Sequence, residues 1–216
     1  MDSVALLLLT DGRFPAGTHA HSSGLEAAVR AGRVTGVEDL EAFLRGRLAT
    51  AGPVTAAFAA AAHRLDDLAL LDAELDARTP SPALRLASRR QGRALLRAAR
   101  ATWPSPVYDR LPASPQHPIA LGVTGSAAGL SAAQTALAAA YGVFTGPAGA
   151  AVRLLSLDPY PVQRLLTRLA GACAAVATAA VAAAGEAPAE LPAHTAPLAD
   201  ISAELHATWE VRLFAS

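Results

Sequence analysis

The stretch from Leu111 to Val152 contains 42 residues and not one Asp, Glu, Lys or Arg. Charged side chains are absent from a helix when all of its faces are covered. A membrane span is excluded for this stretch, because Pro, Gly, Ser, Thr and Gln interrupt it. We therefore expect it either to form the central core or to belong to a sizeable protein–protein interface, and the sequence leaves both possibilities open.

Signals for helices run along the whole chain. Alanine, the strongest helix former, supplies about a quarter of the residues and lets helices approach closely. Apolar residues mark one face from Val37 to Leu48, and no run alternates as a strand does. Helix starts are indicated by capping-box spacing and by an Asp before Pro, at Ser23–Glu26, Thr35–Glu38, Ser131–Gln134 and Asp158–Pro159. The prediction is an all-α, Ala-rich bundle of about eight to ten helices without a sheet.

Two proline-rich stretches interrupt the helical pattern. Residues 103–118 hold five prolines and residues 185–197 hold three. Proline lacks a backbone N–H and favours extended backbone at the residue before it. We expect an extended loop over 103–118 and a mobile surface loop over 185–197. The segments on either side share one character, so we predict a single domain over residues 1–216.

Charge and hydropathy narrow the class of protein. The 18 basic residues are all arginines, and 18 acids balance them to a net charge of zero. A neutral chain has no bulk attraction to nucleic acid or to an anionic membrane. The N-terminus lacks the basic region of a signal peptide, and the apolar stretch Leu169–Gly185 is shorter than a usual span. We predict a cytoplasmic protein that binds neither nucleic acid nor membrane.

An arginine stripe is the exception to this neutrality. No acid lies between Ala77 and Tyr108, and six of the arginines there share one arc of a helical wheel: Arg85, Arg89, Arg90, Arg93, Arg97 and Arg100. The stripe is either the solvated face of an amphipathic helix or a docking surface for an acidic partner or a phosphate. The alternative function is therefore a helical nucleic-acid-binding or regulatory protein that uses the Arg85–Arg100 stripe.

The residue patterns of catalysis are not found. The chain has no G-x-S-x-G motif and, without lysine, no P-loop. The glycines of 122–125 and 142–149 do not match a dinucleotide fingerprint, so we interpret them as close contacts between helices. The single cysteine, Cys173, lies in an apolar stretch and is expected to be buried and inert. We predict no catalytic residue and no cofactor.

Two histidines are weak metal candidates. His19 and His21 flank Ala20, and imidazole nitrogens ligate zinc or nickel. A tight site needs three or four ligands, and only Asp11 lies nearby in the sequence. The pair is either part of a polar loop or a transient contact for a transition metal. A third hypothesis for the function is a small hydrolase built on His19, His21 and Asp11.

The end of the chain is unusually apolar. Trp209, Leu213 and Phe214 lie within its last residues, where most chains are polar and frayed. Apolar side chains in such a place are covered either by the protein's own core or by a partner.

Several motifs follow one another at residues 14–17, 23–29, 87–96, 117–122, 151–157, 206 and 212–216, and in this order they resemble those of the urease accessory protein UreF family. The opening turn and Gly-Leu-Glu of the family are similar to residues 14–17 and 23–29, although Thr18 stands where the family has a second turn glycine. An Arg/Gly helix, a His-x-x-x-x-Gly segment and an Ala-Val-Arg-Leu segment are similar to residues 87–96, 117–122 and 151–157. The closing His and Arg-Leu-Phe-x-Ser are similar to His206 and residues 212–216.

This resemblance implies a non-enzymatic, all-helical and dimeric scaffold for nickel insertion into apo-urease. Such a scaffold binds the accessory protein UreD (also called UreH) and recruits or regulates the GTPase UreG. The resemblance further implies a partner-binding tail over residues 206–216, beginning at His206, in which Arg212, Leu213 and Phe214 engage UreD.

It also places Glu26 at or near the surface that faces the GTPase. The remaining matches, Arg89, Arg93 and Arg153, are family arginines whose role is either structural or interfacial.

Overall fold

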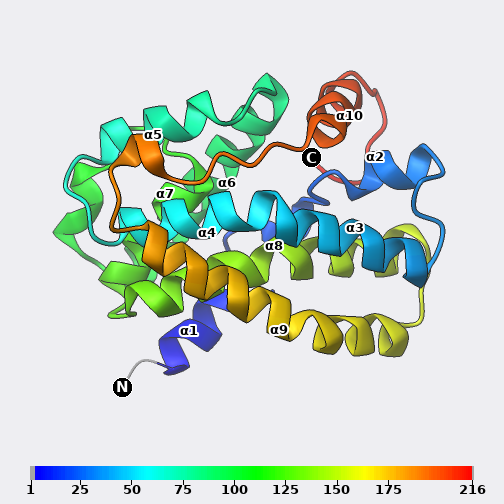
Figure 1. The fold of residues 1–216 in the computed structure, drawn as a ribbon, viewed down its shortest axis with the longest axis horizontal. Coiled ribbons are helices and arrows are strands. Elements are labelled where there is room, and N and C mark those ends of the chain that lie inside the picture. Colours follow the sequence, from blue (N-terminus) through cyan, green and yellow to red (C-terminus); the bar gives the residue numbers. More distant parts are fainter. Residues whose placement is uncertain (1–2, 216) are drawn as a thin grey trace.

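The computed structural model describes residues 3–215, and these form ten α-helices, three short 3-10 helices and no strand (Figure 1). The predicted all-α architecture is confirmed. The α-helices are α1 Ser3–Thr10, α2 Leu25–Arg30, α3 Val37–Ala49, α4 Ala51–Ala62, α5 Leu68–Ala77, α6 Pro82–Thr102, α7 His117–Ala127, α8 Ala132–Leu154, α9 Pro159–Ala183 and α10 Pro197–Ala207. The 3-10 helices are η1 Thr18–Ala20, η2 Pro106–Arg110 and η3 Pro188–Glu190.

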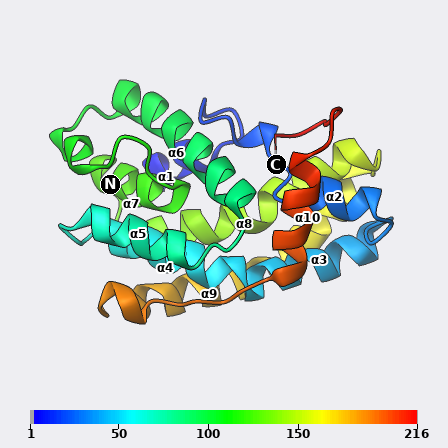
Figure 2. The same ribbon diagram turned by 90° about the horizontal axis from the view of Figure 1, so that it is seen from above.

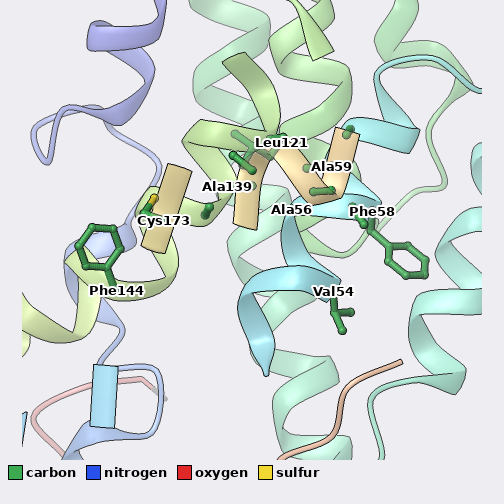
Figure 3. Packing of buried hydrophobic residues seen from close by; sticks show 14 of the residues in the cluster. Val54, Ala56, Phe58, Ala59, Leu121, Ala139, Phe144 and Cys173 are labelled. Atoms are coloured by element: carbon green, nitrogen blue, oxygen red, sulfur yellow. The ribbon is translucent and has the colours of Figure 1, made fainter. Parts of the chain in front are cut away.

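Helix α4 forms the centre of the bundle. It packs against α7, α8 and α9, and residues 56–61, all alanine except Phe58, are fully buried. Figure 3 shows Ala56 and Ala59 close to Leu121 of α7 and Ala139 of α8. A helix that is apolar on every side is one that is covered on every side. The alanine content of the chain is therefore used here for close packing of helix backbones.

Glycine permits the closest of these approaches. A Cβ added to Gly122 in α7 would lie 2.3 Å from the carbonyl oxygen of Ala59 in α4, and one added to Gly125 would lie 2.2 Å from Oγ1 of Thr135. The interpretation as helix–helix contacts is confirmed for these two glycines. It is wrong for Gly142, Gly146 and Gly149, because an added Cβ there would meet nothing within 4 Å.

The uncharged stretch forms much of the core. It supplies α7, which is buried from Pro118 to Gly125, and most of α8, which has eleven buried residues. Two larger α8 side chains, Leu137 and Tyr141, reach the surface with 37% and 42% exposure. Of the two possibilities left open by the sequence, the core accounts for most of this stretch. Cys173 is also buried, as predicted, and burial raises the pKa of its thiol to about 11, so the thiol is protonated at neutral pH.

Helices α8 and α9 are each long and apolar enough to cross a membrane, judged by length and composition alone. In the most apolar part of α8, 61% of the stretch is buried within the chain, as in a core helix, against 28% for α9. The apolar stretch Leu169–Gly185, which the sequence predicts to be too short to span a membrane, lies largely within α9. The helix begins earlier, at Pro159, so it is longer than that stretch.

Local sequence correctly predicts two helix starts. Ser131 Oγ accepts a hydrogen bond from the backbone N–H of Gln134 (3.2 Å), and Gln134 Oε1 accepts one from the N–H of Ser131 (2.8 Å). Asp158 accepts from the N–H of Tyr160 at the start of α9. Replacing Ser131 by alanine is expected to lower the free energy of unfolding by about 1 kcal/mol, measured by urea unfolding. The control is Ser126→Ala in the last turn of α7, because Ser126 caps no helix.

The other two predicted capping boxes are wrong. At Thr35, the hydroxyl and the N–H donate to Oδ2 of Asp39 (2.7 and 2.9 Å), not to Glu38. Helix α2 starts after Gly24, which has a positive φ of 88°, and Ser23 makes no side-chain cap. The carboxylate of Glu26 is instead bonded to the end of the chain.

The proline-rich stretches are more ordered than expected. Residues 103–118 contain η2, in which Tyr108 is 1% exposed, and their last two residues already belong to α7. Residues 185–197 contain η3 and the buried Leu191, and Arg78 donates to the carbonyls of Pro188, Ala189 and Leu191. From η3 the chain runs in an extended segment alongside α4 to reach α10 (Figures 1 and 2). Its anchoring explains why proline here does not produce a free loop.

Candidate functional site

The carboxylate of Glu26 holds the C-terminal segment against α2. Oε1 accepts a hydrogen bond from the backbone N–H of Leu213 (2.8 Å), and Oε2 accepts one from the N–H of Phe214 (3.0 Å). Nε2 of His206 lies 3.0 Å from the same Oε2. One acid thus binds three groups that are 180 to 188 positions away along the chain.

Electrostatics favour the ionised form of Glu26. Burial alone raises its pKa, but the hydrogen bonds from Leu213, His206 and Phe214 outweigh burial and lower the pKa below its usual value. Charge-assisted hydrogen bonds to backbone N–H groups are among the stronger bonds in proteins. The contact is therefore at full strength at neutral pH, and it is lost only when acid protonates the carboxyl group.

The tail beyond Leu213 is anchored by two further contacts. Phe214 is 3% exposed, and the guanidinium of Arg153, at the end of α8, lies 4.4 Å from its ring centroid. Arg153 also donates to the carbonyl of His19 (2.7 Å), and the N–H of Ala215 donates to the carbonyl of Ala20 (2.7 Å). Of the two possible covers for the apolar chain end, the protein's own core covers Phe214.

The rings of His206 and Trp209 stabilise the turn between α10 and the tail. His206 is 4% exposed, and its ring centroid lies 4.8 Å from that of Trp209. The guanidinium of Arg30, at the end of α2, covers the Trp209 ring at 4.1 Å. Both views show α10 beside α2, with the C-terminus next to them (Figures 1 and 2).

Five of the residues singled out in the sequence therefore meet in one place. Glu26, Arg153, His206, Leu213 and Phe214 come from α2, α8, α10 and the tail, and we call them the Glu26 cluster. Arg212 lies in the same segment and is exposed.

Helix α10 presents an apolar face to the outside. Leu198, Ile201 and Leu205 are 57%, 59% and 59% exposed, and their spacing of three and four places them along one side of the helix. Val211 and Leu213, in the tail, are 84% and 68% exposed. We call these five residues the C-terminal apolar face. A row of exposed apolar side chains on one helix, with two more in the segment that follows it, is typical of a protein–protein interface.

Two polar side chains that flank this row attach α10 to the rest of the protein. Oε1 of Glu204 accepts from the hydroxyl of Ser81 and from the N–H of Ala83 (2.9 Å), at the start of α6. The guanidinium of Arg33 donates to the buried hydroxyl of Ser202 (2.9 Å). The apolar face is therefore displayed on a helix that is fixed in position, which lowers the ordering cost of binding.

Arg89 and Arg93 do not belong to the Glu26 cluster. Arg89, on α6, forms ion pairs with Asp72 (2.9 Å) and Asp76 (2.6 Å) of α5, and these pairs raise its pKa despite burial. Arg93 donates to the hydroxyl of Ser114. In this structure both side chains connect α6 to its neighbours.

Other arginines of the stripe are also engaged within the chain. Arg85 donates to the carbonyls of Thr79 and Pro80, and Arg100 donates to Asp109 and to the carbonyl of Tyr108. The stripe is thus in part a set of helix-to-loop connections rather than a uniform free surface.

The metal candidates His19 and His21 lie at a cavity of about 460 Å³, which His117 and Asp11 also line. His19 is exposed, whereas His21 is buried. Within residues 3–215, however, no group of three or more His, Cys, Asp or Glu side chains is arranged so that it could hold a metal ion. The geometry gives a resident metal no binding site among these residues.

Burial of His21 makes the fold sensitive to mild acid. Burial lowers its pKa to about 4, and the charges of Arg90 and His19 act in the same direction; burial and His21 lower the pKa of His117 to about 4. Between pH 6.5 and 4 the unfolded chain therefore binds more protons than the folded one, and stability falls as the pH falls.

Replacing His21 by Gln is expected to reduce this pH slope by about 1 kcal/mol per pH unit. Urea unfolding between pH 7 and 5 measures the slope, with His194→Gln in an exposed segment as the control. Carboxylates with lowered pKa values, such as Glu26, contribute only at lower pH. An unchanged slope for His21→Gln would contradict the buried neutral imidazole.

Some members of the site carry no signal in the sequence. Arg30, Arg33 and Glu204 look like ordinary surface residues, and their partners Trp209, Ser202 and Ser81 lie more than a hundred positions away. Only the tertiary structure brings such pairs together.

Comparison with known proteins points to one family. A family model described as UreF matches residues 34–170. Urease accessory protein UreF of Mycobacterium sp. (strain JLS) is 48% identical over 212 residues, which are 98% of this chain and 97% of the relative. The proteins of the same name from Mycobacterium marinum and Mycobacterium tuberculosis are 48% and 47% identical, over 100% and 84% of this chain and 100% and 87% of their own lengths. The chain belongs to the UreF family of urease accessory proteins.

Proposed function

We propose that this chain is a non-enzymatic, cytoplasmic scaffold that acts as a homodimer in nickel insertion into apo-urease. In this role it binds the accessory protein UreD (UreH) and brings the GTPase UreG to the same assembly. The observation that carries the proposal is the fixed tail: Glu26 binds the backbone of Leu213 and Phe214, while the side chain of Leu213 stays 68% exposed.

UreD binds the C-terminal apolar face in this proposal. Leu198, Ile201 and Leu205 are available on α10, and Leu213 extends the apolar surface onto the tail. Buried apolar anchors surrounded by polar residues supply most of the affinity of protein interfaces. The exposed Arg212 adds a charged group at the edge of this surface.

Glu26 acts on UreG through the tail. Its carboxylate is already bonded to Leu213, Phe214 and His206, so it shapes the surface that the GTPase meets rather than contacting the GTPase itself. Arg153 supports the same surface through Phe214 and His19. Arg89 and Arg93 hold α6 in place and act on the partners only indirectly.

Replacing Leu205 by Glu tests this assignment. A charge buried against an apolar partner loses its hydration, so we expect the affinity for purified UreD to fall by a factor of about ten or more. Biolayer interferometry measures the affinity, and circular dichroism should show an unchanged helix content because Leu205 is 59% exposed.

The control is Tyr160→Glu on α9, a position that is 77% exposed and away from α10. It should keep the wild-type affinity. Equal affinity of Leu205→Glu and the wild type for UreD would contradict the proposed surface.

A further inference from the structure

Arg47 is a partly buried cation without a counter-charge. Near the end of α3, its Nε donates to the carbonyl of Val143 (3.1 Å) and its Nη1 to the carbonyl of Ser23 (2.9 Å). Both acceptors are neutral. Within residues 3–215 no carboxylate forms an ion pair with it.

Comparison with Arg89 shows how carboxylate partners change the pKa of an arginine in this fold. Two carboxylates, those of Asp72 and Asp76, raise the pKa of Arg89 despite its burial. Burial acts alone on Arg47 and lowers its pKa to about 10. A guanidinium with that pKa is still charged at neutral pH, and even a partly buried charge without a partner costs free energy. An anion from solution would remove this cost.

Space for such an anion lies beside Arg47. Two cavities, of about 460 and 560 Å³, are both lined by Arg47 and share a wall formed by Ser23, Thr55, Ser88, Gln91 and Pro118. Hydroxyl and amide groups in this wall are able to donate hydrogen bonds to an oxyanion. Three acids also line the cavities, Asp11 in the smaller one and Asp39 and Asp200 in the larger one. None of them belongs to the shared wall, which contains no acid.

One of the two cavities is amphipathic. The larger lies between α3, α4, α6 and the segment that leads into α10, and Phe43, Val54 and Leu84 give it an apolar wall. An organic acid could place its carboxylate on Arg47 and its aliphatic part along this wall. Pockets with apolar walls and a few convergent polar groups are typical of small-molecule sites.

We propose that the junction of these two cavities is a binding site for a small oxyanion, with the guanidinium of Arg47 as its anchor. The ligand carries a carboxylate or phosphate group, which accepts hydrogen bonds from Arg47 and from the polar side chains of the shared wall. Leu198 of the C-terminal apolar face lines the larger cavity, but the anchor Arg47 belongs to α3 and lies outside that face. Binding of a small anion needs no partner protein, so the proposal goes beyond the scaffold function.

Thermal unfolding and isothermal titration calorimetry of the full chain test the proposal. The probes are the sodium salts of acetate, octanoate and phosphate, compared with chloride at equal ionic strength. In the wild type we expect at least one oxyanion to raise Tm more than chloride does. In Arg47→Gln that shift should disappear and Kd should rise by about tenfold or more, whereas Arg164→Gln, an exposed arginine of α9, should behave as the wild type.

The probes also separate the possible ligands. A stronger effect of octanoate than of acetate indicates an organic acid that uses the apolar wall, and an effect of phosphate alone indicates a free phosphate. The proposal is overturned if no oxyanion exceeds chloride, or if Arg47→Gln retains the full shift. Should this variant not fold, crystals of the wild type soaked in selenate decide: an anomalous peak within hydrogen-bond distance of the guanidinium supports the site, and its absence rejects it.

Discussion

Replacing Gly122 by alanine is expected to lower the free energy of unfolding by about 3 kcal/mol, in the upper part of the range for overpacked cores. The added Cβ would lie 2.3 Å from the carbonyl oxygen of Ala59 and 2.6 Å from the Cβ of Ala62. Neither atom belongs to a flexible side chain, so α4 and α7 must move apart. Because α4 also packs against α8 and α9, this movement loosens the centre of the bundle.

Urea unfolding followed by circular dichroism measures the effect. The matched control is Gly171→Ala in α9, where an added Cβ meets nothing within 4 Å. There we expect a gain of up to about 1 kcal/mol from helix propensity. If both substitutions changed stability alike, α4 and α7 would not be in backbone contact at Gly122.

Replacing Glu26 by Gln is expected to release the tail. The neutral amide keeps the size of the side chain but loses the charge that strengthens three hydrogen bonds. We expect the amides of Leu213 and Phe214 to exchange with deuterium about a hundredfold faster, which corresponds to roughly 2.7 kcal/mol of local stability. Amides of the central helix α4 should keep their protection.

Hydrogen exchange followed by mass spectrometry measures this release. Glu38→Gln, an exposed acid in the first turn of α3, is the matched control and should leave the tail protected. Unchanged exchange at residues 213 and 214 in Glu26→Gln would show that Phe214 and Arg153 hold the tail without the carboxylate.

Local interactions explain which parts of the fold could be predicted. Ser131 with Gln134 and Asp158 with Tyr160 are pairs within three residues of one another, so their spacing in the sequence is enough to place two helix starts. Leu40, Leu44 and Leu48 form the buried face of α3 for the same reason. The all-α class follows from such short-range signals.

Long-range contacts explain what could not be predicted. Ser23–Glu26 has the spacing of a capping box, but three donors from the other end of the chain compete for Glu26 and bind it. The arginine stripe likewise has the appearance of a free surface, because the sequence does not show that Asp72 and Asp76 face Arg89. The apolar chain end was open to two explanations, and the structure divides it: Phe214 is covered by the core, whereas Leu213 remains exposed.

This division changes what a truncation would do. Removing residues 212–216 deletes the exposed Leu213 together with Phe214, which packs against Arg153. Loss of partner binding in such a variant would mix a missing contact with a disturbed core. Substitutions at single positions separate the two effects.

The affinity of Glu26→Gln for purified UreD tests the scaffold account most directly. The account predicts that UreD binds this variant at least about tenfold more weakly than the wild type, while the thermal unfolding temperature of the core stays within a few degrees. Wild-type affinity in a variant whose tail exchanges freely would contradict it, because the surface that UreD recognises would then not depend on the tail that Glu26 holds.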